Sequence, residues 1–138
     1  MKSPATRVAV VSAVCLLAAA GAPAALAAPN TVVNNCGSAS AKPAEMVLTC
    51  ADANSSLTKL TWSSWTNGNA KGSGTYLEND CEPTCVAGTV HSYPAEVQLG
   101  KPRKQGAKRV FSEVTIAFPQ GGPGKITKMM LPLEPYSG

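Results

Sequence analysis

Residues Leu57 to Glu78, LTKLTWSSWTNGNAKGSGTYLE, contain the clearest structural signal in this sequence. In this stretch, two runs rich in Thr, Leu, Trp and Tyr flank the dipeptide Asn67-Gly68. An Asn-Gly pair between two such runs is the strongest short-range signal for a β-hairpin, because a type I′ turn requires positive φ at both central residues. The stretch therefore predicts two antiparallel strands that are joined at this dipeptide.

A two-residue loop at Asn67-Gly68 also determines which side chains share a face of the hairpin. With that loop, Leu60 lies opposite Thr75 and Trp62 lies opposite Ser73. Side chains two residues apart on a strand point to the same face, so Leu77 joins this group. We expect this face to be the core.

Trp65 lies three residues after Trp62, so an unbroken strand directs the two side chains to opposite faces. Trp65 would then share the outer face with Tyr76. We expect Trp65 and Tyr76 to form an exposed aromatic platform that binds a sugar ring, a peptide or another protein. The alternative is that a second layer, or the segment 28–42, covers Trp65.

Further strands are expected on both sides of this hairpin, because apolar residues alternate there with polar ones. Pro94 interrupts one of them and marks an edge strand or a bulge, and residues 100–108 form a polar connector. No segment shows a convincing helical period, so the sequence predicts an all-β fold, a small antiparallel sandwich or open barrel. The additional strand candidates are residues 46–50, 89–99, 110–118 and 126–131.

Residues 1–27 have the three parts of a secretory signal peptide. Lys2 and Arg7 precede an uncharged apolar run from Val8 to Ala20, and Ala25-Leu26-Ala27 offers a cleavage site. A membrane-spanning helix needs about 20 apolar residues, and Gly21 and Pro23 interrupt this run too early. We therefore expect cleavage after Ala27, an extended arm over residues 28–45, and a single β domain over residues 46–138.

The cysteines indicate the compartment and the covalent framework. Cys15 leaves with the signal peptide, and four cysteines remain: Cys36, Cys50, Cys81 and Cys85. An even number in a short exported chain predicts two disulfides. We favour the pairs Cys36–Cys50 and Cys81–Cys85, which close short loops. The main alternative pairs Cys50 with one of the two later cysteines.

Charge excludes some partners. Without residues 1–27 the chain has 111 residues, with ten Lys or Arg, eight Asp or Glu, and a net charge of +2. This balance does not predict a nucleic-acid partner, and no second apolar segment is long enough to enter a membrane after cleavage. The basic run from Lys101 to Arg109 is a candidate for binding an anionic partner, but it lacks interleaved aromatic residues. We expect it to be a solvated connector.

Catalysis and metal binding have little support. His91, the one histidine, is a candidate general base next to Asp80 or Glu82, but no motif supplies a nucleophile. We therefore predict no catalytic residue and no cofactor. The set of Cys50, Cys81, Cys85 and His91 offers metal ligands, but disulfides are the expected state of the cysteines in an exported chain. We predict no metal site.

Residues 42–97 contain several short runs of defined Trp, Cys and Pro spacing, most clearly Leu60-Thr61-Trp62-Ser63-Ser64-Trp65 and Asn79-Asp80-Cys81-Glu82-Pro83-Thr84-Cys85. In these runs the chain resembles a family of small secreted actinobacterial proteins of unknown function. The resemblance covers about half of the mature chain. It implies export and a single small domain, and it brings no activity, cofactor or catalytic residue.

Together these features predict a secreted, extracellular protein that acts by binding. The expected partner is an extracellular or cell-wall ligand or protein, recognised by a rigid disulfide-bonded scaffold. The alternative function is an extracellular enzyme that uses His91 with Asp80 or Glu82. A third class is a structural or inhibitory protein whose loops fit a partner.

Overall fold

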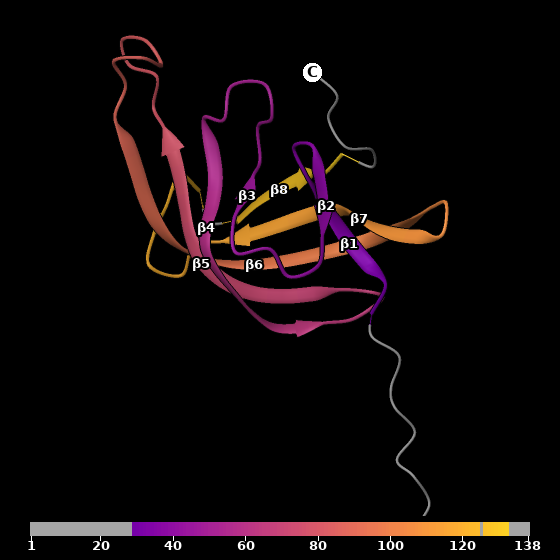
Figure 1. The fold of residues 1–138 in the computed structure, drawn as a ribbon. Helices are drawn as coiled ribbons and strands as arrows, with labels where there is room; N and C mark the ends of the chain where they lie inside the picture. Colours follow the sequence, from indigo (N-terminus) through magenta and orange to yellow (C-terminus); the bar gives the residue numbers. More distant parts are fainter. Residues whose placement is uncertain (1–28, 125, 133–138) are drawn as a thin grey trace, which may run out of the picture.

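The computed structural model describes residues 29–124 and 126–132, and every regular element in them is a β-strand (Figure 1). The predicted all-β class is confirmed. The predicted signal peptide lies outside the described residues. The strands are β1 (Thr31–Asn35), β2 (Ser38–Ser40), β3 (Met46–Val47), β4 (Ser55–Trp65), β5 (Ala70–Asn79), β6 (Val90–Gln105), β7 (Lys108–Ala117) and β8 (Ile126–Met130).

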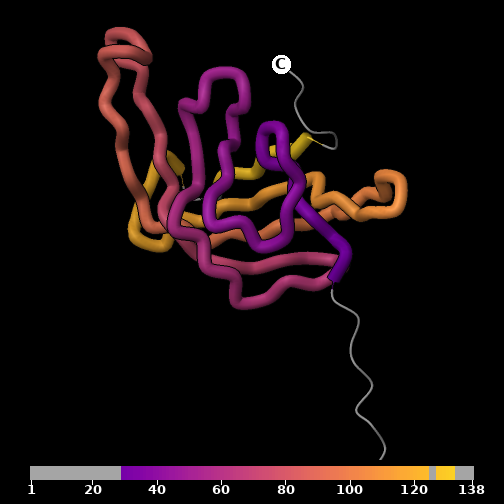
Figure 2. Tube along the Cα trace, in the orientation of Figure 1, coloured from indigo at the N-terminus to yellow at the C-terminus, as the bar shows by residue number. Residues whose placement is uncertain are grey.

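One curled sheet holds all the strands, in the order β2-β1-β7-β6-β5-β4-β3. Strand β8 also pairs with β7, beyond the point where β1 pairs with it. The pairs are antiparallel except β1 with β7, which is parallel, so the sheet is mixed rather than purely antiparallel. The curl produces a half-barrel whose hollow side contains the core (Figures 1 and 2).

The segment predicted as an extended arm, residues 28–45, contributes two strands to this sheet. Val33 of β1 is fully buried. The Thr31 hydroxyl donates to the backbone carbonyl of Asn67 at 3.1 Å, and the Thr31 carbonyl accepts a bond from Trp65 Nε1 at 2.9 Å. The predicted boundary at residue 45 therefore does not separate an arm from a domain, since β1 closes one side of the core.

The turn at Asn67-Gly68 is confirmed in position but not in type. The amide of Thr66 donates to the carbonyl of Asn69 at 2.8 Å, as a two-residue loop requires. Neither Asn67 nor Gly68 has a left-handed φ, so the turn is not type I′. Instead, the Thr66 hydroxyl accepts the amides of Gly68 and Asn69 at 3.2 and 3.0 Å, a side-chain turn of the kind Ser and Thr support.

Two irregularities in β4 overturn the predicted register. The pairing shifts between Thr58 and Thr61 and again between Trp62 and Ser64, so each bulge adds one residue to β4. A bulge of this kind bends the strand and changes which face the following side chains occupy. Trp62 consequently pairs with Gly72 and not with Ser73 as predicted. A Cβ at Gly72 would collide with the Trp62 ring, so the ring lies against bare backbone there.

The shifted register moves the core to the other face of β5. Tyr76 is buried, whereas Leu77, predicted to be core, is only half-buried. Edge-to-face aromatic contacts join Trp65 to Phe111 and Tyr76 to Phe118, with ring centroids 5.5 and 5.3 Å apart. The largest fully buried side chains around them include Met46, Leu57, Leu99, Ile116 and Val114.

The prediction that residues 100–108 form a polar connector is wrong. Strand β6 continues to Gln105 and forms a long hairpin with β7, whose last pair is Gln105 with Lys108. The predicted strand over residues 110–118 is confirmed by β7. Pro94 pairs with Thr75 of β5, before β6 begins to pair with β7 at Glu96. At Pro94, β6 therefore pairs with a neighbouring strand on one side only. Proline is tolerated at such an edge position because it has no backbone N–H to donate.

Both predicted disulfides are confirmed. Cys36–Cys50 joins the loop after β1 to the loop after β3, and Cys81–Cys85 closes a small loop between β5 and β6. The first connects the β1–β2 hairpin to the β3–β4 loop. The second lies at the far end of the β5–β6 hairpin, away from the core.

Candidate functional site

The aromatic platform predicted from the sequence is not present. Trp65 is 7% exposed and Tyr76 is 4% exposed, and both belong to the core. The Trp65 indole is covered by β1, through its hydrogen bond to Thr31, which is the alternative that the sequence left open. Burial, and then the nearby Glu78 carboxylate, raises the pKa of the Tyr76 hydroxyl. The prediction that Trp65 and Tyr76 bind a ligand on the surface is therefore wrong.

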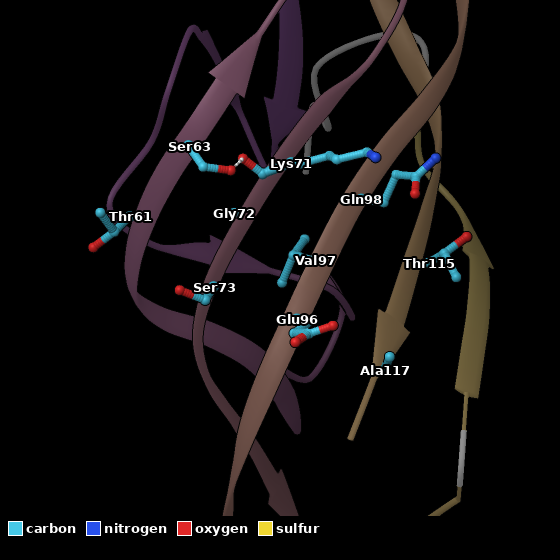
Figure 3. A pocket seen from close by; sticks show the side chains of 10 residues that line it. All are labelled: Thr61, Ser63, Lys71, Gly72, Ser73, Glu96, Val97, Gln98, Thr115 and Ala117. Atoms are coloured by element: carbon cyan, nitrogen blue, oxygen red, sulfur yellow. Dashed lines mark hydrogen bonds between the residues drawn. The ribbon is translucent and has the colours of Figure 1, made fainter. Parts of the chain in front are cut away.

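The outer face of the sheet has one broad groove across β4, β5, β6 and β7 (Figure 3). It encloses about 620 Å³ and is open to solvent. Its side chains offer hydroxyls, an amide and one charge of each sign, Lys71 and Glu96, but no aromatic ring. The groove is therefore a polar depression without an apolar anchor. It is lined by Thr61, Ser63, Lys71, Gly72, Ser73, Glu96, Val97, Gln98, Thr115 and Ala117.

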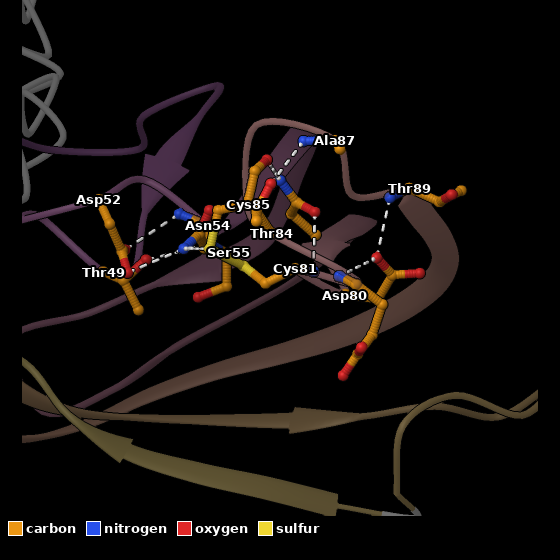
Figure 4. Close-up of a disulfide and its surroundings, with 12 residues drawn as sticks. Thr49, Asp52, Asn54, Ser55, Asp80, Cys81, Thr84, Cys85, Ala87 and Thr89 are labelled. Atoms are coloured by element: carbon orange, nitrogen blue, oxygen red, sulfur yellow. Dashed lines mark hydrogen bonds between the residues drawn. A yellow bond between two sulfur atoms is a disulfide. The ribbon is translucent and has the colours of Figure 1, made fainter.

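A more specific geometry is found where β5 and β6 are joined by residues 80–89, the segment we call the stapled tip. The Asn79 side chain binds this segment twice. Its Nδ2 donates to the Cys85 carbonyl at 2.7 Å, and its Oδ1 accepts the amide of Cys81 at 3.0 Å. A Cβ at Gly88 would collide with Asn79 Oδ1, so the tip returns to β6 through a position that only glycine fits. The disulfide Cys81–Cys85 adds a covalent constraint (Figure 4).

The Asp80 carboxylate also holds the stapled tip through hydrogen bonds. Its Oδ1 accepts the amides of Glu82 at 3.1 Å and Thr89 at 2.8 Å, and its Oδ2 lies 2.9 Å from His91 Nε2. The hydrogen bond with His91, followed by those from the two amides, lowers the pKa of Asp80 to about 2. The carboxylate is thus ionised at neutral pH, and its oxygens are used to close the tip.

The structure brings together only part of the predicted catalytic set. His91 contacts Asp80, but within residues 29–124 and 126–132 no hydrogen bond or ion pair joins it to Glu82. The His91 side chain is 45% exposed and stacks near Tyr93, with ring centroids 6.5 Å apart. It does not line the groove. The contact between His91 and Asp80 is therefore one of the bonds that hold the stapled tip in its conformation.

A second loop, residues 51–54 between β3 and β4, lies directly beside the stapled tip. The amide of Asn79 donates to the Asn54 carbonyl at 2.9 Å, and Asn54 Nδ2 lies 3.3 Å from Cys85 Sγ. Asp52 accepts the amide of Asn54, which is the main cause of the lowered pKa of Asp52 (Figure 4). The two loops therefore support each other's conformation.

Between these loops lies a depression of about 470 Å³, which we call the tip pocket. Its rim carries Val86, which is fully exposed, and Val90, which is 60% exposed. Leu77, displaced from the core by the shifted register, lines it as well. The sequence pattern did not predict this site, although a valine directly after Cys85, in an otherwise polar loop, was a signal. The lining residues are Asp52, Ala53, Asn54, Ser56, Leu77, Asn79, Cys85, Val86 and Val90.

The charges around the tip pocket have one sign. Four carboxylates belong to this end of the molecule, and neither residues 48–58 nor residues 75–92 contain a Lys or Arg. The site therefore combines exposed apolar side chains with a negative surrounding, which favours cationic groups. The four acids are Asp52, Glu78, Asp80 and Glu82.

The described part of the chain contains neither a cluster of metal ligands nor a membrane-spanning helix. All four cysteines there are in disulfides, and no three His, Cys, Asp or Glu side chains gather as metal ligands among the residues described. Residues 29–124 and 126–132 also contain no helix that could span a bilayer.

Comparisons with models of protein families, with curated proteins and with solved structures find no match. The geometry of the tip pocket and its surroundings is therefore the basis for assigning a function.

Proposed function

We propose that this protein is an extracellular binding module that recognises a polypeptide partner through the tip pocket. The observation that carries the proposal is the fully exposed Val86 on a loop held by a disulfide. The Val86 side chain does not pack in the core, and its exposed apolar surface is available to a partner. Holding the loop in one conformation before binding lowers the entropy cost of association.

The chemistry of the pocket indicates the class of partner. Val86, Val90 and Leu77 offer apolar contact, and Asn54 and Asn79 offer hydrogen bonds to a peptide backbone. The acidic surroundings favour a neighbouring Lys or Arg on the partner. We therefore infer that the pocket takes an apolar side chain next to a basic one, in a segment of a protein.

The extracellular location is supported by two features. Both disulfides are of the kind that persists in oxidising compartments. Residues 1–27 have the composition of a secretory signal peptide. The resemblance to small secreted actinobacterial proteins agrees with both, and it adds no partner.

A displayed library of linear peptides, selected on the immobilised disulfide-bonded protein, tests the proposal. We expect enriched peptides to pair an aliphatic or aromatic residue with Lys or Arg. Val86→Ser should weaken their binding about 5-fold or more, because truncating a central apolar anchor of an interface costs more than about 1 kcal/mol. Asp52→Asn should weaken basic peptides more than neutral ones.

The matched control is Met130→Ser on β8. Met130 is 70% exposed, so this variant also removes an exposed apolar side chain, but on a strand that does not line the tip pocket. We expect it to bind the selected peptides as the original protein does. Equal affinity in Val86→Ser, or a selection without enriched peptides, would refute the proposal.

The alternative, an extracellular enzyme that uses His91 with Asp80 or Glu82, has less support. The 2.9 Å contact between His91 and Asp80 favours it. However, Asp80 also accepts two backbone amides, and no Ser, Thr or Cys side chain is hydrogen-bonded to His91 in the described part of the chain. A general base without a positioned nucleophile or substrate cavity is weak evidence for catalysis.

A further inference from the structure

The hairpin between β6 and β7 ends in a projection that carries most of the positive charge of the described chain. We call residues 101–109 the basic arm, which contains Lys101, Arg103, Lys104, Lys108 and Arg109. Figure 1 shows it in orange, extending away from the rest of the sheet. Every cation in it is exposed. The sequence predicted a solvated connector here, whereas the structure has a two-stranded ribbon.

Most of these cations have no ionic partner in the described part of the chain. Lys101 is the exception, since its Nζ lies 2.9 Å from Glu113 at the base of the arm. No carboxylate of residues 29–124 and 126–132 forms an ion pair with Arg103, Lys104, Lys108 or Arg109. Four positive charges thus gather at the end of the ribbon without local neutralisation.

The register of the hairpin increases the repulsion among them. Lys104 lies directly opposite Arg109, and like charges in directly opposed positions destabilise a β-ladder. Arg103 and Lys108 belong to the other face of the ribbon, because neighbouring residues on a strand alternate. The cations therefore surround the end of the arm on both faces, and an anion that binds there relieves their repulsion.

We propose that the basic arm binds a linear phosphate-bearing polymer. Two arginines supply planar guanidinium groups, which match phosphate oxygens in pairs, and two lysines add point charges. Lys104 and Arg109 are directly opposed on one face, and Arg103 and Lys108 are diagonal neighbours about 7–8 Å apart on the other, so each face presents a pair of charges to an extended chain. A linear polymer can contact both faces, whereas a single small anion contacts only one.

Other anionic partners fit the arm less well. The turn at its end contains Gly106 and Ala107, so no bulky apolar side chain is available to enter a lipid surface. No aromatic residue occurs between Lys101 and Arg109 on which a nucleic-acid base could stack. Recognition must therefore use the backbone charges of the polymer.

This site is separate from the tip pocket. Strand β6 has the stapled tip at its beginning and the basic arm at its end, a contour of up to about 50 Å for 16 residues. The acidic side chains gather at the first end. They repel a polyanion and confine it to the basic arm, so the two ends select partners of opposite charge.

The test is the binding of long-chain inorganic polyphosphate to the purified disulfide-bonded protein, measured by calorimetry over a series of salt concentrations. If four cations contact phosphates, affinity should fall about 100-fold between 50 and 200 mM salt, by analogy with counterion release from nucleic acids. The variant Arg103→Gln, Lys104→Gln, Lys108→Gln, Arg109→Gln should lose this dependence and bind at least about 10-fold more weakly.

A matched variant removes the same number of charges elsewhere: Lys42→Gln, Lys59→Gln, Lys71→Gln, Lys128→Gln. It should retain most of the affinity, which separates the basic arm from the effect of net charge. Circular dichroism and thermal unfolding of both variants establish that they are folded. A matched variant that loses as much affinity as the arm variant would overturn the proposal.

Two further probes decide the class of polymer. Polygalacturonate, which carries carboxylates instead of phosphates, should bind more weakly than polyphosphate at the same salt. Vesicles of mixed phosphatidylglycerol and phosphatidylcholine should also bind more weakly at an equal concentration of phosphate groups. Tighter binding to either probe would contradict the assignment to a phosphate polymer.

Discussion

The two ends of β6 carry hairpin tips of opposite construction. At Val90 the strand leaves the stapled tip, where a disulfide, Asn79 and Asp80 fix the chain. At Lys101 it enters the basic arm, where the two strands are joined by backbone pairing and a short turn. One tip is acidic with exposed valines, and the other is basic without an apolar anchor.

This difference shows how one curled sheet can present two kinds of surface. Covalent and side-chain bonds preorganise the stapled tip, which suits a partner with a defined shape. The basic arm is held by backbone pairing and carries exposed charged side chains, which suit a polymer recognised by charge. Both tips extend from the same sheet and core, so both depend on the core for their stability. They differ in local rigidity, because only the stapled tip is held by a disulfide and by side-chain hydrogen bonds.

The largest expected effect tests the dependence of both tips on the core. Trp65→Ala should lower the free energy of unfolding by about 3–5 kcal/mol, because it deletes a large buried ring and leaves the Thr31 carbonyl without its donor. Urea unfolding measures the loss, and hydrogen exchange should show reduced protection in both β5–β6 and β6–β7. If Trp65 were the exposed platform predicted from the sequence, the variant would unfold like the original protein.

Trp62→Ala provides the comparison. Trp62 is only half-buried, although its Nε1 donates to the Pro43 carbonyl at 2.8 Å. Removing its ring should therefore cost less than removing that of Trp65. A larger loss in Trp62→Ala than in Trp65→Ala would contradict the placement of Trp65 within the core and of Trp62 at its margin.

The position of Trp65 shows where sequence reasoning failed, because the bulge brings it to the core side beside Trp62, with ring centroids 4.8 Å apart. The Asn67-Gly68 signal located the turn, and the pairing next to it, Trp65 with Ala70, agrees with a two-residue loop. The prediction failed farther along β4, because two bulges change the register. Bulges depend on how strongly the sheet curls around its core, which a local pattern does not contain.

Two other features were beyond local patterns for similar reasons. The parallel pairing of β1 with β7 joins residues far apart in the chain, so alternation alone could not reveal it. The basic arm resembles a connector because Gly100, Pro102 and Gly106 disfavour strands locally. The disulfides were predictable, because four cysteines with two short spacings leave few arrangements.

An intermediate effect should separate the two tips. Replacing both Cys81 and Cys85 with Ser should cost up to about 2 kcal/mol, from the chain-entropy estimate for so short a loop. Hydrogen exchange should rise at the amides of Cys81 and Thr89 and remain unchanged in the basic arm. Peptide binding at the tip pocket should weaken in parallel, because the loop is no longer held in one conformation.

The control is the pair Cys36→Ser and Cys50→Ser, which opens a loop of about 15 residues and should cost about 3 kcal/mol. This disulfide connects the β1–β2 hairpin to the β3–β4 loop, so its loss should affect the core as well. If the Cys81 and Cys85 variant loosened the basic arm equally, the two tips would not be independent.

The smallest effect concerns the basic arm alone. Lys104→Glu replaces a repulsive pair with an attractive one opposite Arg109, and cross-strand pairs of this kind contribute about 0.2–1 kcal/mol. The melting temperature should therefore rise by a few degrees, up to about 8 °C at the upper limit. Affinity for polyphosphate should fall at the same time, because a positive charge becomes negative.

A higher melting temperature together with a lower affinity distinguishes the two roles of Lys104. If Lys104 stabilised the fold, its replacement would not raise the melting temperature. Lys71→Glu is the control, because Lys71 pairs with Ser64 and Gln98, which are uncharged. It should leave both the melting temperature and polymer binding nearly unchanged. A decrease in stability for Lys104→Glu would mean that the facing cations do not repel each other, and the basic arm would then have no stored repulsion for an anion to relieve.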